Sequence, residues 1–230
     1  MNAFRIAERL SQVRSRIVDF ARSCDRDPKA IRLIAVSKTR TAKEVRAAFE
    51  AGQHEFGENY LQDALPKIEA LKEHPIQWHF IGRIQSNKTR DISAHFDWVH
   101  TLSSSKHARR LDSQRPASLP PLQVCIQVNV SGEASKGGVT PAQTPELTQL
   151  IAALPNLQLR GLMTMAPADS SEAGQRRIFR ELRKLLESLN QGGLELDTLS
   201  MGMSNDMKAA ICEGATMVRI GTAIFGPRAC

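Results

Sequence analysis

Short apolar runs alternate with amphipathic segments along most of this 230-residue sequence, and this alternation constrains the fold more than any other feature. The apolar runs predict strands at residues 31–37, 54–57, 77–81, 98–102, 122–130, 157–165, 196–201 and 217–220. The segments between them predict helices at residues 41–51, 58–71, 87–95, 105–111, 145–154, 172–189 and 205–213. Parallel strands need crossover connections, which are usually helices. Eight strand–helix units of this length therefore favour a closed (β/α)8 TIM barrel of class α/β.

One further helix precedes the first strand. Its apolar residues recur at spacings of four and three: Ile6, Leu10, Val13, Ile17 and Phe20. Such barrels run as one domain of roughly 200 to 250 residues, and no linker is visible, so we expect a single domain over residues 1–230. An open doubly wound sheet is disfavoured because no GxGxxG turn follows the first strand.

Composition narrows the function classes. The net charge of +7 and pI near 9.5 favour acidic ligands. Aromatic residues make up only 5% of the chain and the basic residues are scattered, so nucleic acid is not an expected partner. The N-terminal segment carries Arg5, Glu8 and Arg14 and resembles neither a signal peptide nor a membrane span.

The cysteines indicate no metal site and no disulfide framework. Cys24, Cys125, Cys212 and Cys230 show no CxxC spacing and no paired histidines nearby. We therefore expect a protein of the reducing cytoplasm.

Ligand-binding residues of such barrels follow the carboxyl ends of the strands. The positions at that rim are Lys38, Asn59, Gly82, Ser103, Asn129, Met165, Ser204 and Gly221. A phosphate commonly binds after strands seven and eight, where the sequence has Gly202 and Ser204 and then Gly221 and Thr222. Ser204 alone could instead cap the helix predicted at 205–213.

Lys38 ends the first strand on the same side as Ile34 and Val36, at the barrel mouth. Its stem could simply lie on apolar surface with the amine in water. Beside a phosphate site, however, a lysine amine suits a Schiff base with pyridoxal phosphate, which carries both a phosphate and an aldehyde.

Arg219 alternates with Val218 and Ile220 on the last strand and so can face the barrel interior. A buried arginine needs an acceptor, which could be a pyridine nitrogen or a barrel-lining carboxylate, and both remain open. His79, on the third strand, is expected to be a hydrogen-bonded core residue rather than a base.

Several motifs together resemble the pyridoxal 5′-phosphate homeostasis protein family, single-barrel proteins similar to the N-terminal domain of alanine racemase. They are AVSKT around Lys38, FGENYLQ at 56–62, WHFIGRIQSNK at 78–88, VNVSGEASKGG at 128–138, GLMTM at 161–165, and LSMGMSNDM through VRIGTAIFG near the end. The resemblance covers nearly the whole chain.

The resemblance implies a set of cofactor-binding residues. Lys38 would carry pyridoxal 5′-phosphate covalently, Ser204, Gly221 and Thr222 would bind the phosphate, Arg219 would face the pyridine nitrogen, and Asn59 and Met201 would line the cofactor. It further implies no established turnover: the protein would buffer the cofactor or deliver it to pyridoxal-phosphate-dependent apoenzymes, with effects on amino-acid metabolism. We expect a monomer. Asn205 stands where the family often has an acid.

The main alternative is a pyridoxal-phosphate-dependent amino-acid racemase of the same barrel type. Racemisation needs proton donors on both faces of the cofactor, and the resemblance implies that racemases take a tyrosine from a second domain. This sequence ends shortly after the eighth strand, and its sole tyrosine is Tyr60. A phosphosugar barrel without cofactor is a third possibility, since the phosphate turns alone do not name their ligand.

Overall fold

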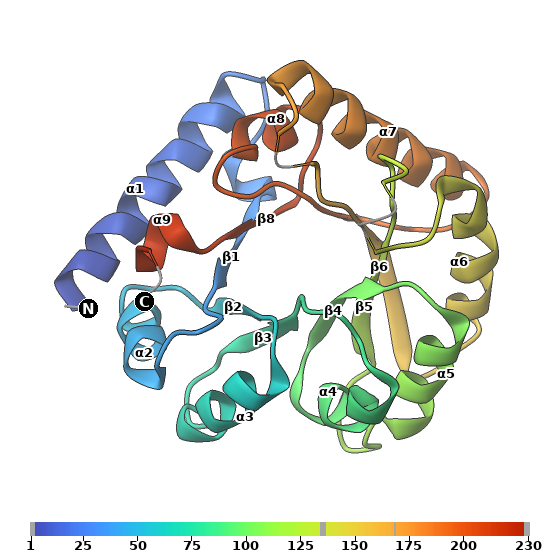
Figure 1. Cartoon of the computed structure of the whole chain (residues 1–230), viewed down its shortest axis with the longest axis horizontal. Helices are drawn as coiled ribbons and strands as arrows, with labels where there is room; N and C mark the ends of the chain where they lie inside the picture. The colour runs from blue at the N-terminus through green and yellow to red at the C-terminus, as the bar shows by residue number, and fades with distance from the viewer. Residues whose placement is uncertain (1–2, 134–136, 168, 228–230) are drawn as a thin grey trace.

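In a computed structural model that describes residues 3–133, 137–167 and 169–227, eight parallel strands close into a barrel (Figure 1). The strands are β1 (Arg32–Val36), β2 (Glu55–Glu58), β3 (Gln77–Phe80), β4 (Trp98–Leu102), β5 (Leu122–Gln127), β6 (Leu157–Met163), β7 (Thr198–Ser200) and β8 (Met217–Ile220). They follow one another in chain order, and β8 pairs back onto β1 with Ile34 beside Arg219. The predicted TIM barrel is confirmed.

Helices surround the barrel on its outside (Figure 1). They are α1 (Ala3–Arg22), α2 (Ala42–Glu50), α3 (Leu61–Ala70), α4 (Thr89–His95), α5 (Ser105–Gln114), α6 (Thr144–Ala152), α7 (Glu172–Gln191), α8 (Met207–Cys212) and α9 (Thr222–Phe225). Short 3-10 turns add η1 (Pro28–Ala30), η2 (Ser86–Lys88) and η3 (Pro141–Gln143). The predicted extra helix is α1, which lies against α2, α8 and α9 and buries its apolar stripe.

Several helix starts differ from the sequence prediction, and two of these differences bear on the site. The helix expected from residue 58 begins at Leu61, because β2 continues through Glu58, which pairs with Phe80. The helix expected from residue 205 begins at Met207 with Asp206 at its N-cap, so Ser204 does not cap it. A capping box starts α2, in which the Thr41 hydroxyl accepts from the Glu44 backbone N–H and the Glu44 carboxylate accepts from the Thr41 backbone N–H.

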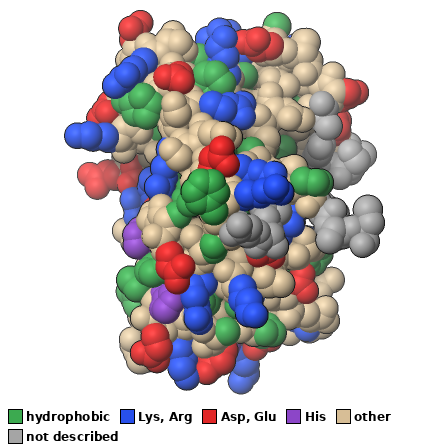
Figure 2. All heavy atoms as spheres, turned by 90° about the vertical axis from the view of Figure 1, so that its left-hand side faces the viewer, with side chains coloured by type: hydrophobic (Ala, Val, Ile, Leu, Met, Phe, Trp, Pro, Cys, Tyr) green, Lys and Arg blue, Asp and Glu red, His purple; other side chains and the backbone are tan. Residues whose placement is uncertain are grey.

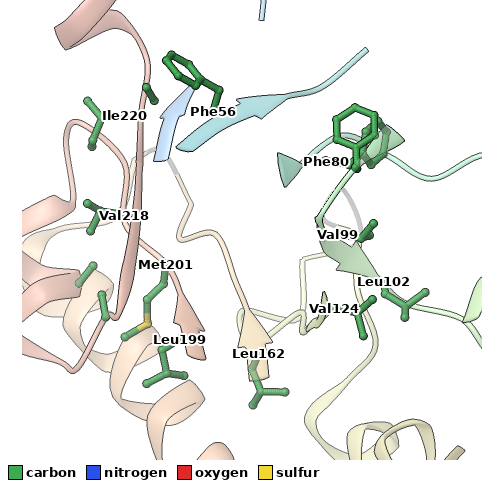
Figure 3. Packing of buried hydrophobic residues seen from close by; sticks show 14 of the residues in the cluster. Phe56, Phe80, Val99, Leu102, Val124, Leu162, Leu199, Met201, Val218 and Ile220 are labelled. Carbon is green, nitrogen blue, oxygen red and sulfur yellow. The ribbon is translucent and has the colours of Figure 1, made fainter. Parts of the chain in front are cut away.

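Apolar side chains pack in two layers. The strand residues that point outward pack under the helices, among them Phe56, Val99, Leu162 and Val218 (Figure 3). A smaller cluster fills the barrel interior and consists of Ile34, Trp98, Cys125, Met163 and Met217. Buried polar side chains, among them His79, His100, Ser200 and Arg219, also lie in the interior and lead toward the candidate site.

The expectation of no disulfide is wrong for one pair. Cys24, just after α1, and Cys212, at the end of α8, form a disulfide with their Cα atoms 5.2 Å apart. The partners are 188 residues apart in sequence, and they meet because α1 packs across α8. The spacing of the cysteines in the sequence does not indicate that these two residues are in contact.

The surface is mixed in charge on the side that carries α1. Figure 2 shows basic and acidic side chains interspersed there rather than gathered into a single basic stripe. Across the described ranges, no helix is both long and apolar enough to span a membrane. No group of three or more histidine, cysteine or acidic residues suited to a metal ion occurs within the same ranges.

Candidate functional site

A cavity of about 640 Å³ opens at the carboxyl ends of the strands, and we call it the main cavity. Its walls include six of the seven predicted cofactor residues: Lys38, Asn59, Ser204, Arg219, Gly221 and Thr222. They come from the ends of β1, β2, β7 and β8, which barrel closure makes neighbours. Met165, another rim position, also lines the cavity, whereas Gly82, Ser103 and Asn129 do not.

Met201 is not in the wall of the main cavity. Its side chain is fully buried in the outer apolar layer, near Leu199 and Val218 (Figure 3). Because Ser200 faces the barrel interior, its neighbour Met201 faces outward by the alternation of a strand.

The turns after β7 and β8 bring the backbone close to the main cavity. Gly202 has φ 96°, and a Cβ there would lie 2.6 Å from the Cβ of Ala210. A Cβ on Gly221 would lie 3.3 Å from the carbonyl oxygen of Val36. The Ser204 hydroxyl makes no hydrogen bond to any residue that the structure describes, so it is available to a ligand. Both turns start helices, whose first N–H groups have no intrahelical acceptors.

Lys38 follows β1 and, with Val36, lines the main cavity. The chain turns sharply after it, since Thr39 has φ 62°, a left-handed conformation that is unusual for a β-branched residue. The Arg40 guanidinium donates to the carbonyl oxygens of Gly226 and Pro227, at 2.6 and 2.9 Å. These hydrogen bonds tie the segment that carries Lys38 to the residues that follow α9.

A buried ion pair lies behind the ends of β1 and β2. Lys67 of α3 donates to a Glu58 carboxylate oxygen at 2.5 Å and to the Ser37 carbonyl oxygen at 2.9 Å. The Ser37 hydroxyl donates to the same Glu58 oxygen at 2.5 Å. Burial raises the pKa of Glu58 above its ordinary value, although Lys67 and Ser37 oppose the rise. Ser37 precedes Lys38 and Glu58 precedes Asn59, so this network fixes both strand ends.

Arg219 is buried in the barrel interior and lines the main cavity. It donates to the Ser200 hydroxyl at 2.7 Å and to the Thr164 carbonyl oxygen at 3.1 Å. Within the described ranges it has no carboxylate at ion-pair distance, so the salt-bridge interpretation is not supported. Burial lowers the pKa of Arg219 to about 10, with Asp206 opposing the shift, and the group stays cationic at neutral pH.

A chain of hydrogen bonds runs from Arg219 down the barrel interior. Ser200 Oγ lies 2.7 Å from His100 Nδ1, and His100 Nε2 lies 2.9 Å from His79 Nδ1. His79 Nε2 then lies 3.5 Å from a Glu55 carboxylate oxygen, within ion-pair distance but without a hydrogen bond. A carboxylate only accepts, so the His79 proton sits on Nε2 and its Nδ1 accepts from His100. Ser200 then donates to His100 and accepts from Arg219. This order requires both histidines to be neutral, and burial lowers the pKa of each.

Sequence reasoning missed Asp206, which lines the main cavity and is 6% exposed. Its carboxylate accepts the Met203 amide and so tightens the turn that presents Ser204. Burial raises the pKa of Asp206. The sequence prediction started this helix at residue 205 and so placed Asp206 inside it, which hid the position of Asp206 at the N-cap.

The residues of the main cavity fit a phosphorylated aldehyde bound through a pyridine ring. One wall offers the Lys38 amine, the two turns offer hydroxyl and backbone N–H donors, and Arg219 offers donors only. An arginine at a ring nitrogen leaves that nitrogen unprotonated, because arginine does not give up its proton at neutral pH.

Comparison with known proteins defines the class. Residues 9–229 match the family described as alanine racemase, N-terminal domain. The alanine racemase of Bacillus anthracis has the same fold, with a TM-score of 0.73 at 16% identity over 98% of this chain and 56% of that one. The fold and the family match thus define a barrel of the alanine racemase N-terminal type.

Relatives of higher identity define the family within that class. The pyridoxal phosphate homeostasis protein of Pseudomonas aeruginosa is 56% identical over 223 residues, 97% of this chain and 96% of the relative. That of Escherichia coli K12 is 48% identical over 97% of each chain. PipY of Synechococcus elongatus, in a structure with PLP bound, superposes with a TM-score of 0.85 at 38% identity over 96% of this chain and all of that one. The chain belongs to the pyridoxal phosphate homeostasis protein family.

Proposed function

We propose that this protein binds pyridoxal 5′-phosphate in the main cavity as a Schiff base on Lys38 and serves to hold and deliver it. The observation that carries the proposal is the meeting of Lys38, Arg219 and the two small-residue turns in one cavity. The PLP-bound structure of PipY supports it, since that protein has the same fold at 38% identity.

Each residue has a defined task in this proposal. Ser204, Gly221 and Thr222 bind the phosphate, Arg219 donates to the pyridine nitrogen, and Asn59 forms the wall beside Lys38. Met201 acts only from the outer layer, by supporting the strand end under Ser204. When bound, the cofactor supplies an aldehyde that amines can capture.

Slow or absent turnover fits the same residues. The described wall contains two side chains suited to proton transfer, Lys38 and Asp206, and the Asp206 carboxylate is already engaged by the Met203 backbone N–H. Tyr60, the sole tyrosine of the sequence, is 57% exposed and does not line the main cavity. A racemase would need a second donor facing Lys38 across the cofactor, so the racemase alternative has less support.

The proposal extends to the setting of the protein. We infer a cytoplasmic monomer formed of a single domain that passes the cofactor to pyridoxal-phosphate-dependent apoenzymes. Within the part of the chain that the structure describes, the large exposed apolar side chains, Phe4, Tyr60, Leu119 and Met203, belong to four separate segments, which agrees with a monomer.

Absorbance titration of cofactor-free protein with pyridoxal 5′-phosphate tests this function. We expect a saturable band near the edge of the visible range that is lost in Lys38→Ala. We also expect alanine and serine racemisation below about 1 per second with the loaded protein. A band that persists in Lys38→Ala contradicts the assignment of Lys38, and rapid racemisation contradicts the carrier role.

A further inference from the structure

A second cavity of about 190 Å³ adjoins the main cavity, and we call it the side cavity. It lies between the segments that follow β2 and β3, and Asn59 lines both cavities. Its walls consist of Asn59, Tyr60, Leu61, Gln62, Phe80, Arg83, Gln85 and Lys88. No role assigned so far to the main cavity uses these residues, apart from Asn59.

The side cavity is lined by two cations and by no acid. Among the described residues, neither Arg83 nor Lys88 has a carboxylate partner or a side-chain hydrogen bond. The nearest buried carboxylate along the chain, Glu58, is already engaged by Lys67. Two unpaired cations on one small cavity favour an anionic ligand group.

The start of α3 adds donors to the same wall. Tyr60 occupies the N-cap, and its side chain does not cap the helix. The first N–H groups of α3 therefore lack a side-chain acceptor, and Leu61 and Gln62 of this turn line the side cavity. A carboxylate bound by Arg83 and Lys88 would also be stabilised by this helix terminus.

Asn59 supplies a hydrogen-bond acceptor, the group that a cationic part of a ligand requires. Its Oδ1 atom is buried and has no hydrogen-bond partner among the described residues. A buried acceptor without a donor costs free energy, so such an atom points to a missing partner. Because this atom is closed off from both cavities, an ammonium group at their boundary would satisfy it after a rotation of the Asn59 side chain, and the group would then stand beside the cavity that contains Lys38.

The remaining wall is apolar, and the volume is small. Leu61 and Phe80 are 7% and 2% exposed and form a hydrophobic floor. At about 190 Å³ the cavity is smaller than the roughly 300 to 1,000 Å³ typical of pockets for drug-sized ligands, so it suits a ligand of a few non-hydrogen atoms. That is the size of a small α-amino acid such as alanine.

We propose that the side cavity binds a small α-amino acid, with its carboxylate at Arg83 and Lys88 and its ammonium at Asn59. This inference deepens the proposed function, because it identifies the class of amine that is brought next to the bound cofactor. The binding step itself depends only on the side cavity and does not require the cofactor.

Backbone amide NMR of the cofactor-free, ¹⁵N-labelled protein tests the inference. L-alanine should shift the amide resonances of Leu61 and Gln62 and the side-chain amide of Asn59 in a saturable way. Alaninamide, which lacks the carboxylate, should need a concentration about tenfold higher at equal ionic strength, the equivalent of about 1.4 kcal/mol. Propionate, which lacks the amine, should shift the α3 amides but not the Asn59 amide.

Substitutions at the two cations of the side cavity provide a second test of the inference. The double substitution Arg83→Gln with Lys88→Gln should raise the half-saturating L-alanine concentration about tenfold. Arg90→Gln removes an exposed cation on α4 that does not line the cavity, and it should leave that concentration unchanged. Equal affinity for L-alanine and alaninamide, preference for inorganic phosphate over L-alanine, or no effect of the double substitution would overturn the inference.

The result of the L-alanine titration can be distinguished from the result of the absorbance titration with pyridoxal 5′-phosphate. If L-alanine shifts the α3 amides while pyridoxal 5′-phosphate gives no Lys38-dependent band, the side cavity stands and the proposed function fails. If the band forms and L-alanine shifts none of the three resonances, the proposed function stands and the side cavity does not bind amino acids.

Discussion

Removing the buried cation behind Lys38 should destabilise the fold strongly, in a way that depends on pH. In Lys67→Met, the Glu58 carboxylate keeps its burial but loses the ammonium that lies 2.5 Å away. Breaking a buried ion pair by removing one partner costs about 3 to 5 kcal/mol. With an m-value of about 3 kcal/mol per M, the urea midpoint should fall by about 1 to 1.7 M at pH 8.

The sign of the pH dependence follows from Glu58. Its folded-state pKa is already raised by burial, and loss of Lys67 raises it further. A carboxyl with a raised folded pKa stabilises the fold below its unfolded pKa and loses that contribution as the pH rises through its folded pKa. The deficit of Lys67→Met should therefore be smaller at about pH 5 than at about pH 8.

Two matched variants make this test decisive. Lys72→Met removes an exposed partner of Glu69 on the same stretch of chain and should leave the midpoint nearly unchanged. Glu58→Gln combined with Lys67→Met removes the uncompensated charge and should recover more than half of the loss. The reasoning is refuted if Lys67→Met matches wild type at pH 8, or if its deficit does not shrink as the pH falls.

Two further predictions concern the turn after β7 and the barrel interior. Gly202→Ala should lower the free energy of unfolding by about 1 to 3 kcal/mol more than Gly193→Ala, measured by urea denaturation. Both glycines have φ 96°, but only at Gly202 does a Cβ meet another atom within 4 Å, so equal losses would refute the packing argument. His100 should remain neutral at about pH 5.5, below the ordinary histidine pKa of about 6.5, because burial lowers its pKa. NMR of its ring protons checks this, and a protonated ring at that pH would contradict the hydrogen-bond order from His79 to Arg219.

The sequence predicts this fold well because its signals are local. Strand and helix periods repeat eight times, and the barrel follows from that repetition. The inward direction of Arg219 also follows from alternation along β8, and the structure confirms its burial. The same alternation, applied to β7, would have placed Met201 on the outer layer.

The remaining features depend on which segments the closed barrel brings together. Lys67 and Glu58 lie on a helix and a strand, so no single periodicity links them. The interior row of polar residues from Glu55 to Arg219 comes from five strands, β2, β3, β4, β7 and β8. In the sequence each of these residues is a single polar position within an apolar run, so nothing there links one to the next. The Cys24–Cys212 disulfide depends in the same way on packing between α1 and α8.

Reduction with borohydride followed by peptide mass spectrometry tests the central claim most directly. The protein is incubated with pyridoxal 5′-phosphate, reduced, digested and searched for lysines that carry the reduced cofactor. Our account predicts one predominant labelled residue, Lys38, and its label should disappear when inorganic phosphate competes at high concentration. Predominant labelling of any other lysine, or no label at a cofactor concentration that saturates the absorbance band, would contradict it.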